Sequence, residues 1–161
     1  MTKNDFCEMT LQSMKPAEKL IGMAPTDKLG WKPGPTFMSV GQVICHLSEG
    51  VGGGLEMLLN GKWPSMDEME TAMKLENMPS CEIEEALGRL EKDKTILRAT
   101  LDGLSEDDFT NRVVSVPWGW KAKFEIMGVA LLGHFNNHKM QLFTYLKLLG
   151  LPVNTESLYG V

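Results

Sequence analysis

The chain has 161 residues, 43% of them hydrophobic, which is the size of one domain with enough apolar material for one core. Its net charge is −5 and its lysines and arginines are scattered without a basic stripe, which argues against DNA or RNA as a partner. The N-terminus lacks a signal-peptide pattern, and no apolar run reaches the roughly 18 residues that a membrane span needs. We therefore expect one domain over residues 1–161, in the cytoplasm, with neither a nucleic acid nor a membrane as partner.

The three cysteines, Cys7, Cys45 and Cys81, are widely spaced and include no C-x-x-C pair. An odd number of cysteines at such distances indicates neither a disulfide framework nor a thiolate zinc site. We expect all three to be reduced and buried, as is usual for cysteines of a cytosolic protein.

The spacing of apolar residues is helical through most of the chain. It predicts a first helix over about residues 3–23, in which Pro16 either causes a kink or starts a new helical segment. Residues 24–38 contain three prolines and two glycines and are expected to form an ordered loop. Ser39 and Gln42 then form an S-x-x-Q capping box, which predicts a second helix that ends near residues 61–64.

Residues 65–79 are acidic and rich in methionine, which is typical of a loop or a short surface helix. Ser80 is expected to cap a third helix that reaches Leu101, and a short capped segment follows within residues 102–109.

Residues 111–116 are the only candidate for a strand, and residues 116–122 are expected to be a loop. A last helix is predicted from about Lys123 to Leu149, with Gly150 as its stop. Four main helices predict an all-α protein built as a four-helix bundle.

Two of the three histidines, His134 and His138, lie four residues apart on this last helix. They belong to a seam of residues spaced three and four apart along the helix. We expect this seam to face the interior, while Lys139 lies off it. Buried imidazoles need a partner, which could be a metal ion bound by both rings or a hydrogen-bonding group in the core. The seam consists of Phe124, Met127, Leu131, His134, His138, Gln141, Tyr145 and Leu148.

The remaining histidine, His46, lies on the second helix, just before a stretch with four glycines at residues 49–54. Glycine is unfavourable inside a helix, so its abundance here calls for an explanation. Either the glycines allow close packing between helices, or the missing side chains leave space for a ligand beside His46.

The segments "LGWKPGPTFMSVGQVICHLSEG", "GHFNNHKMQLFTYLKLLG" and "LYG" resemble the DinB-like superfamily of metal-binding enzymes. Members have W-x-P before the second helix, a histidine inside it, and H-x-x-x-H followed by Q-x-x-x-Y-L-x-x-x-G on the last helix. The resemblance implies an up-down-down-up four-helix bundle with a divalent metal ion held by His46, His134 and His138. It leaves the activity open, because relatives include thiol S-transferases, a mycothiol-dependent isomerase and proposed metal-dependent hydrolases.

Three neutral imidazoles would leave an open position on the ion, which is typical of a catalytic site rather than a structural one. The ligand type favours zinc or nickel, with iron, cobalt or manganese as alternatives. We expect an enzyme that acts on a small molecule, either as a hydrolase or as a transferase that uses a low-molecular-weight thiol. The alternative is a non-catalytic bundle in which the metal or a ligand serves stability or sensing.

Two further residues are candidates for the catalytic machinery. Gln141 lies one turn beyond His138 and would orient a ligand or reactant, unless it is only a core amide bonded to the backbone or to Tyr145. Glu49 follows His46 by three residues and would serve as a base or support a ligand, unless it is a solvated surface side chain. We also expect a homodimer, because members of the family commonly pair through helices and residues 66–78 offer an adaptable methionine-rich surface.

Overall fold

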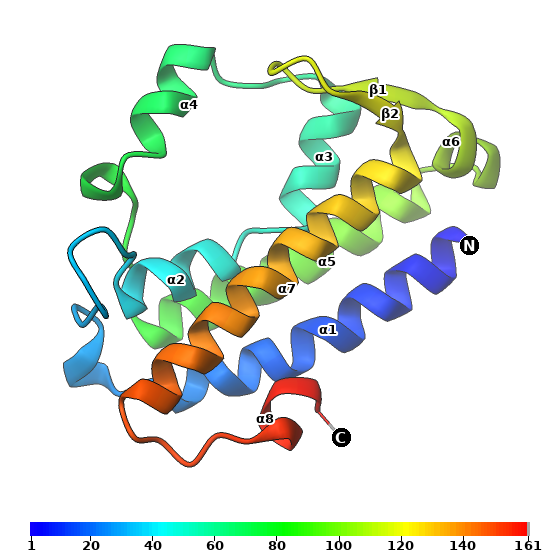
Figure 1. Ribbon diagram of the computed structural model, residues 1–161. Coiled ribbons are helices and arrows are strands. Elements are labelled where there is room, and N and C mark those ends of the chain that lie inside the picture. Colours follow the sequence, from blue (N-terminus) through cyan, green and yellow to red (C-terminus); the bar gives the residue numbers. More distant parts are fainter. Residues whose placement is uncertain (161) are drawn as a thin grey trace.

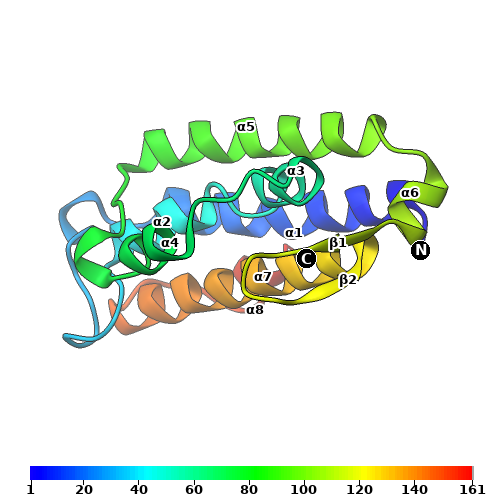
Figure 2. The same ribbon diagram turned by 90° about the horizontal axis from the view of Figure 1, so that it is seen from above.

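The computed structural model describes residues 1–160, and four long helical elements form its body (Figure 1). They are α1 (Lys3–Met23), the pair α2 (Val40–Leu47) and α3 (Gly52–Asn60), α5 (Ile83–Asp102) and α7 (Phe124–Leu148). Figures 1 and 2 show that α1 and α7 run in one direction and that α2, α3 and α5 run in the other. The predicted all-α, up-down-down-up bundle is confirmed. No helix within residues 1–160 combines the length and the apolar character that crossing a membrane requires.

The first helix begins and ends where its sequence pattern predicts. Thr2 and Asp5 form a capping box at the start of α1, and the helix continues through Pro16 to Met23. Its core-facing residues include Phe6, Met14 and Leu20, which are fully buried. The helix is therefore one continuous element, and Pro16 does not start a second one.

The second helix is interrupted, and the prediction of one continuous helix to residues 61–64 is wrong. The capping box of Ser39 and Gln42 starts α2 as predicted, but α2 ends at Leu47 and α3 begins at Gly52. At the start of α3, the backbone N–H groups at residues 51–53 donate to the carboxylate of Asp93 on α5, at 3.2, 2.9 and 2.8 Å. This carboxylate takes the place of the carbonyl acceptors that an uninterrupted helix would supply.

The third long helix, α5, begins at Ile83, and its N-cap residue is Glu82, two residues after the predicted cap. Ser80 is not the cap, because it packs against α2 instead: a methyl group added to Gly41 would lie 2.1 Å from the Ser80 Oγ atom. The N–H of the next residue, Cys81, also donates to the carbonyl of Gly41 at 3.2 Å. Contact with α2 therefore keeps the chain extended here and delays the helix.

Cys45 and Cys81 form a disulfide, so the expectation that all cysteines are reduced is wrong for this pair. Both side chains are buried, with exposed fractions of 1% and 2%, and only Cys7 is a free cysteine within residues 1–160. The two cysteines are 36 positions apart, and their spacing gave no sign of the bond, since the contact arises from the packing of Cys81 against α2.

The segment between α3 and α5 lies largely outside the core. It contains α4 (Met66–Ala72), which Ser65 and Glu68 cap and which has no buried residue, and the 3₁₀ turn η2 (Leu75–Asn77). This is the short surface helix that was one of the two predicted alternatives, and Figure 1 shows it standing apart from the bundle. The Gln42 Nε2 atom ties the end of the segment to α2 by donating to the carbonyls of Leu75 and Met78.

A helical turn and a small hairpin connect α5 to α7. Ser105 caps α6 (Glu106–Asn111), which is the predicted short capped segment and runs two residues past its expected end, and β1 (Val113–Ser115) pairs antiparallel with β2 (Lys121–Lys123). The second strand was predicted as a loop, because a strand of three residues carries no readable alternation. Gly150, with φ of +83°, follows the end of α7. Two short helical turns, η1 (Thr26–Lys28) and α8 (Thr155–Tyr159), were not predicted.

Candidate metal centre

The three histidines converge from two helices. His46 lies in the last turn of α2, and His134 and His138 lie on successive turns in the middle of α7, which packs against α2. One nitrogen of each ring lies within 4.8 Å of the corresponding atoms of the other two. The Nε2 atoms of His46 and His134 are 2.9 Å apart. Three nitrogen donors at this separation can hold one metal ion.

The histidines lie at the edge of the helix packing rather than in its interior, so the predicted burial of the seam is only partly correct. His134 is exposed and Leu148 is 61% exposed, whereas Lys139, predicted to lie off the seam, is only 8% exposed. The buried side of α7 is centred on Phe135, Leu142 and Leu146, and Phe135 points about 100° around the helix from His134. The site is consequently open to solvent on its His134 side.

The surroundings favour the neutral imidazoles that bind metals. Burial, together with the neighbouring rings of His138 and His134, lowers the pKa of His46 from 6.5 to about 4. Burial and the proximity of His138 also lower the pKa of His134. Both rings therefore offer a lone pair at neutral pH, which is the form a metal ion requires.

Gln141 contacts a candidate ligand directly. The Nδ1 atom of His138 donates to the Gln141 Oε1 atom at 2.8 Å, and the Gln141 Nε2 atom donates to the Tyr145 hydroxyl at 2.9 Å. The Tyr145 ring lies edge-on against Trp31, with 5.6 Å between the ring centroids. This chain of contacts fixes the proton of His138 on Nδ1 and leaves the lone pair on Nε2.

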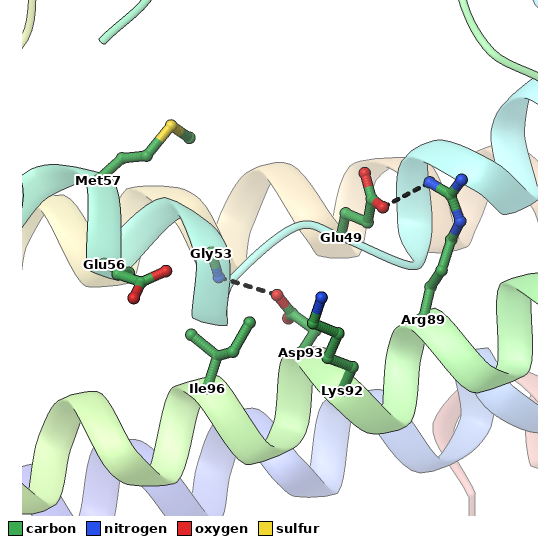
Figure 3. A pocket seen from close by; sticks show the side chains of 8 residues that line it. All are labelled: Glu49, Gly53, Glu56, Met57, Arg89, Lys92, Asp93 and Ile96. Atoms are coloured by element: carbon green, nitrogen blue, oxygen red, sulfur yellow. Dashed lines mark hydrogen bonds and ion pairs between the residues drawn. The ribbon is translucent and has the colours of Figure 1, made fainter. Parts of the chain in front are cut away.

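Glu49 points toward α5 and forms an ion pair with Arg89, at the rim of a pocket between α3 and α5 (Figure 3). Its side chain is 58% exposed. No carboxylate or thiol of residues 1–160 joins the three-histidine group. The role of Glu49 as a base stays a prediction, and it would require Glu49 to leave Arg89.

The glycines after His46 serve close packing at two positions. A methyl group at Gly52 would lie 2.2 Å from the carbonyl oxygen of Asp93, and one at Gly54 would lie 2.9 Å from a methyl carbon of Leu131. Backbone and side chain fill these positions, so they leave no room for a ligand. Close helix packing is therefore the correct interpretation at Gly52 and Gly54, whereas Gly53 lines the pocket between α3 and α5.

Sequence reasoning missed Asp93, which caps the start of α3. Asp93 is 3% exposed, and Figure 3 shows its carboxylate directed at Gly53. A signal was present in the sequence: Asp93 occupies a position between Leu90 and Leu97 in the apolar seam of α5, where a carboxylate is out of place unless it has partners.

The fold and the site define a class of protein: a helix bundle in which three histidines from two helices form a group able to hold a metal ion. The family model described as the DinB superfamily matches residues 12–142, and the chain belongs to this superfamily.

Solved structures with the same fold come from three bacteria. A DinB-like protein from Bacillus subtilis has a TM-score of 0.68 at 16% identity, with 92% of this chain and 96% of that chain covered. A DinB-like protein from Bacillus cereus has a TM-score of 0.72 at 16% identity, covering 95% and 96%. A protein assigned to the DinB family from Exiguobacterium sibiricum has a TM-score of 0.71 at 17% identity, covering 96% of each chain. No curated protein matches the sequence.

Proposed function

We propose that the protein is a divalent-metal-dependent enzyme that acts on a small molecule, with His46, His134 and His138 as the metal ligands. The observation that carries this proposal is the convergence of one nitrogen from each ring within 4.8 Å, on the solvent-accessible edge of the bundle. Three imidazoles suit zinc or nickel, with iron, cobalt and manganese as further candidates.

Each residue of the centre has a distinct task in this proposal. The three imidazoles hold the ion, and Gln141 fixes the tautomer and the orientation of His138. The exposed side of His134 leaves a path by which a reactant can approach. When bound, a divalent ion would supply the Lewis acidity that activates a thiol or a water molecule for attack.

We favour transfer of a low-molecular-weight thiol over hydrolysis. The Glu49 carboxylate is paired with Arg89, and no carboxylate of residues 1–160 joins the histidines, so a base for activating water is not in place. A thiol would need no such base, because its ordinary pKa is already about 8.5 and coordination to a divalent ion deprotonates it outright.

The test is a turnover assay on protein stripped with a chelator and reloaded with zinc or nickel. Electrophilic small molecules are offered with and without a low-molecular-weight thiol. We expect turnover that requires both the metal and the thiol. Turnover with metal alone would favour the hydrolase, and no turnover together with a large metal-dependent rise in melting temperature would favour the non-catalytic alternative.

A stability measurement separates a catalytic metal from a structural one. Circular dichroism of the chelator-treated wild type should retain the helical signal, because the apolar faces of the helices already form a core. His134→Ala should lose metal binding, yet the metal-free variant should stay within about 1–2 kcal/mol of the metal-free wild type. Loss of helix in chelator alone would assign the ion a structural role, since its binding energy would then be folding energy.

A further inference from the structure

Helix α5 carries no histidine, yet one of its side chains forms hydrogen bonds with the backbone shortly after His46. Asp93, in the middle of α5, accepts the N–H of Gly53 on Oδ1 and those of Val51 and Gly52 on Oδ2. The carboxylate is 3% exposed and lies between α3 and α5. Val51 is the N-cap residue of α3, and Gly52 and Gly53 are the first two residues of this helix.

These bonds decide between two conformations of the same segment. The apolar spacing and the capping box of residues 40–60 suit one continuous helix, in which the N–H groups at 51–53 would donate to carbonyls four residues earlier. With Asp93 as the acceptor, α2 instead ends at Leu47, one residue after His46. Gly52 permits this arrangement, because any side chain there would collide with the backbone of α5.

We propose that Asp93 is a positioning residue for the metal centre: by capping the start of α3 at residues 51–53, it fixes the break in the helix directly after His46 and sets how α2 presents this ligand to His134 and His138. This inference rests on the proposed function, since it takes the three histidines as metal ligands. Asp93 acts through the backbone and does not contact the ion.

A carboxylate is suited to this task and an amide is not. Asp93 offers two acceptor oxygens to three donors, whereas asparagine has one acceptor oxygen and an NH₂ group that would face an N–H. The Glu49–Arg89 ion pair also links the segment between α2 and α3 to α5. Its side chains are 58% and 35% exposed, and exposed ion pairs contribute little to stability. The buried contacts of Asp93 are therefore the stronger constraint on the turn.

The direct test compares Asp93→Asn with Asp102→Asn, the same substitution at an exposed position of α5. Zinc affinity is measured by competition with a chromophoric chelator, and the geometry of the centre by the absorption spectrum of the cobalt-loaded protein. We expect zinc affinity to fall about 10- to 100-fold in Asp93→Asn, with a changed cobalt spectrum and no change in Asp102→Asn. Wild-type affinity and spectrum in a folded Asp93→Asn would overturn the inference.

A second measurement needs no variant, so it tests the inference even if Asp93→Asn fails to fold. If the capped turn and the metal centre are coupled, binding of zinc must stabilise the cap by the same amount that the cap strengthens binding. Amide hydrogen exchange of the wild type should then slow at residues 51–53 on addition of zinc, by a larger factor than in the hairpin at residues 113–115. Equal slowing in both places would refute the coupling.

The outcomes for the inference and for the proposed function are distinguishable. If His46→Ala binds zinc as tightly as the wild type, the ligand assignment fails and the inference fails with it. If zinc binding requires His46 but is indifferent to Asp93, the proposed function stands and only the positioning role of Asp93 is removed.

Discussion

Gln141 links the metal centre to the packed interior. It accepts the Nδ1 proton of His138, donates to the Tyr145 hydroxyl, and so connects a partly buried ring to a tyrosine that is 3% exposed. The Gln141 amide thus contacts both of the partners that were considered from the sequence, a candidate metal ligand and Tyr145. With these two bonds, Gln141 holds the His138 ring in one orientation and one tautomer.

Replacing Gln141 with leucine should weaken zinc binding by about 10- to 100-fold, because His138 loses the acceptor that holds its ring. Competition titration with a chromophoric chelator measures the effect. Gln12→Leu, at an exposed position of α1, is the matched control and should bind like the wild type. Equal affinity in both variants would reduce Gln141 to a core amide without influence on the centre.

The metal-free protein should lose stability as the pH falls from about 6.5 toward 4. The folded state lowers the pKa of His46 to about 4, so the unfolded chain takes up the proton first and is favoured as the pH drops. The lowered pKa of His134 acts in the same direction. Thermal melts of chelator-treated protein measure this loss, and His46→Gln should show a shallower pH dependence. An identical dependence in the variant would contradict the assignment to His46.

At the scale of elements, the sequence predicted correctly those helix ends that neighbouring residues determine. The capping box of Ser39 and Gln42 gave the start of α2 correctly, because every group involved lies within four residues. The end of α2 depends on Asp93, more than 40 residues away, and the start of α5 depends on the contact of Ser80 with Gly41. Such contacts between distant segments leave no periodic pattern to read.

Gly52→Ala should destabilise the protein by about 1–3 kcal/mol or more, because the added methyl group would lie 2.2 Å from the Asp93 carbonyl oxygen and 2.8 Å from the Leu97 nitrogen. Gly88→Ala is the matched control on α5, since nothing lies within 4 Å of a methyl group there. It should stabilise by about 0.5–1 kcal/mol through helix propensity. Urea unfolding of both variants gives the comparison, and a neutral Gly52→Ala would mean that α3 does not dock so closely on α5.

At the scale of the whole molecule, the three candidate ligands were identified from the sequence, but the openness of their site was not. The resemblance to the family pointed to His46, His134 and His138, and the structure brings them together. Their exposure depends on how far α7 is rotated against its neighbours. The apolar spacing left this rotation uncertain, as the burial of Lys139 illustrates.

The expected homodimer remains a prediction, and α4 with its C-cap residue Met73 offers a surface for it, since Met66 is 50% and Met73 70% exposed. Sedimentation at micromolar concentration should reveal a species of twice 17.9 kDa. Met73→Glu should shift it toward the monomer by placing a charge in the contact, whereas Tyr159→Glu, at an exposed position of α8, should not. A wild type that sediments only at 17.9 kDa would contradict the prediction.

The disulfide between Cys45 and Cys81 closes the intervening chain, which includes α3 and the exposed α4, into a covalent ring. A protease that nicks the ring at exposed α4 would therefore release nothing: the two fragments should migrate as one band on a denaturing gel and separate only after reduction. Because both halves of the bundle keep their contacts, the nicked protein should retain its metal affinity. The exposed α4 segment of this ring is also a place where residues can be inserted, deleted or exchanged, in evolution or by design. The disulfide would keep both ends of the ring beside the metal centre.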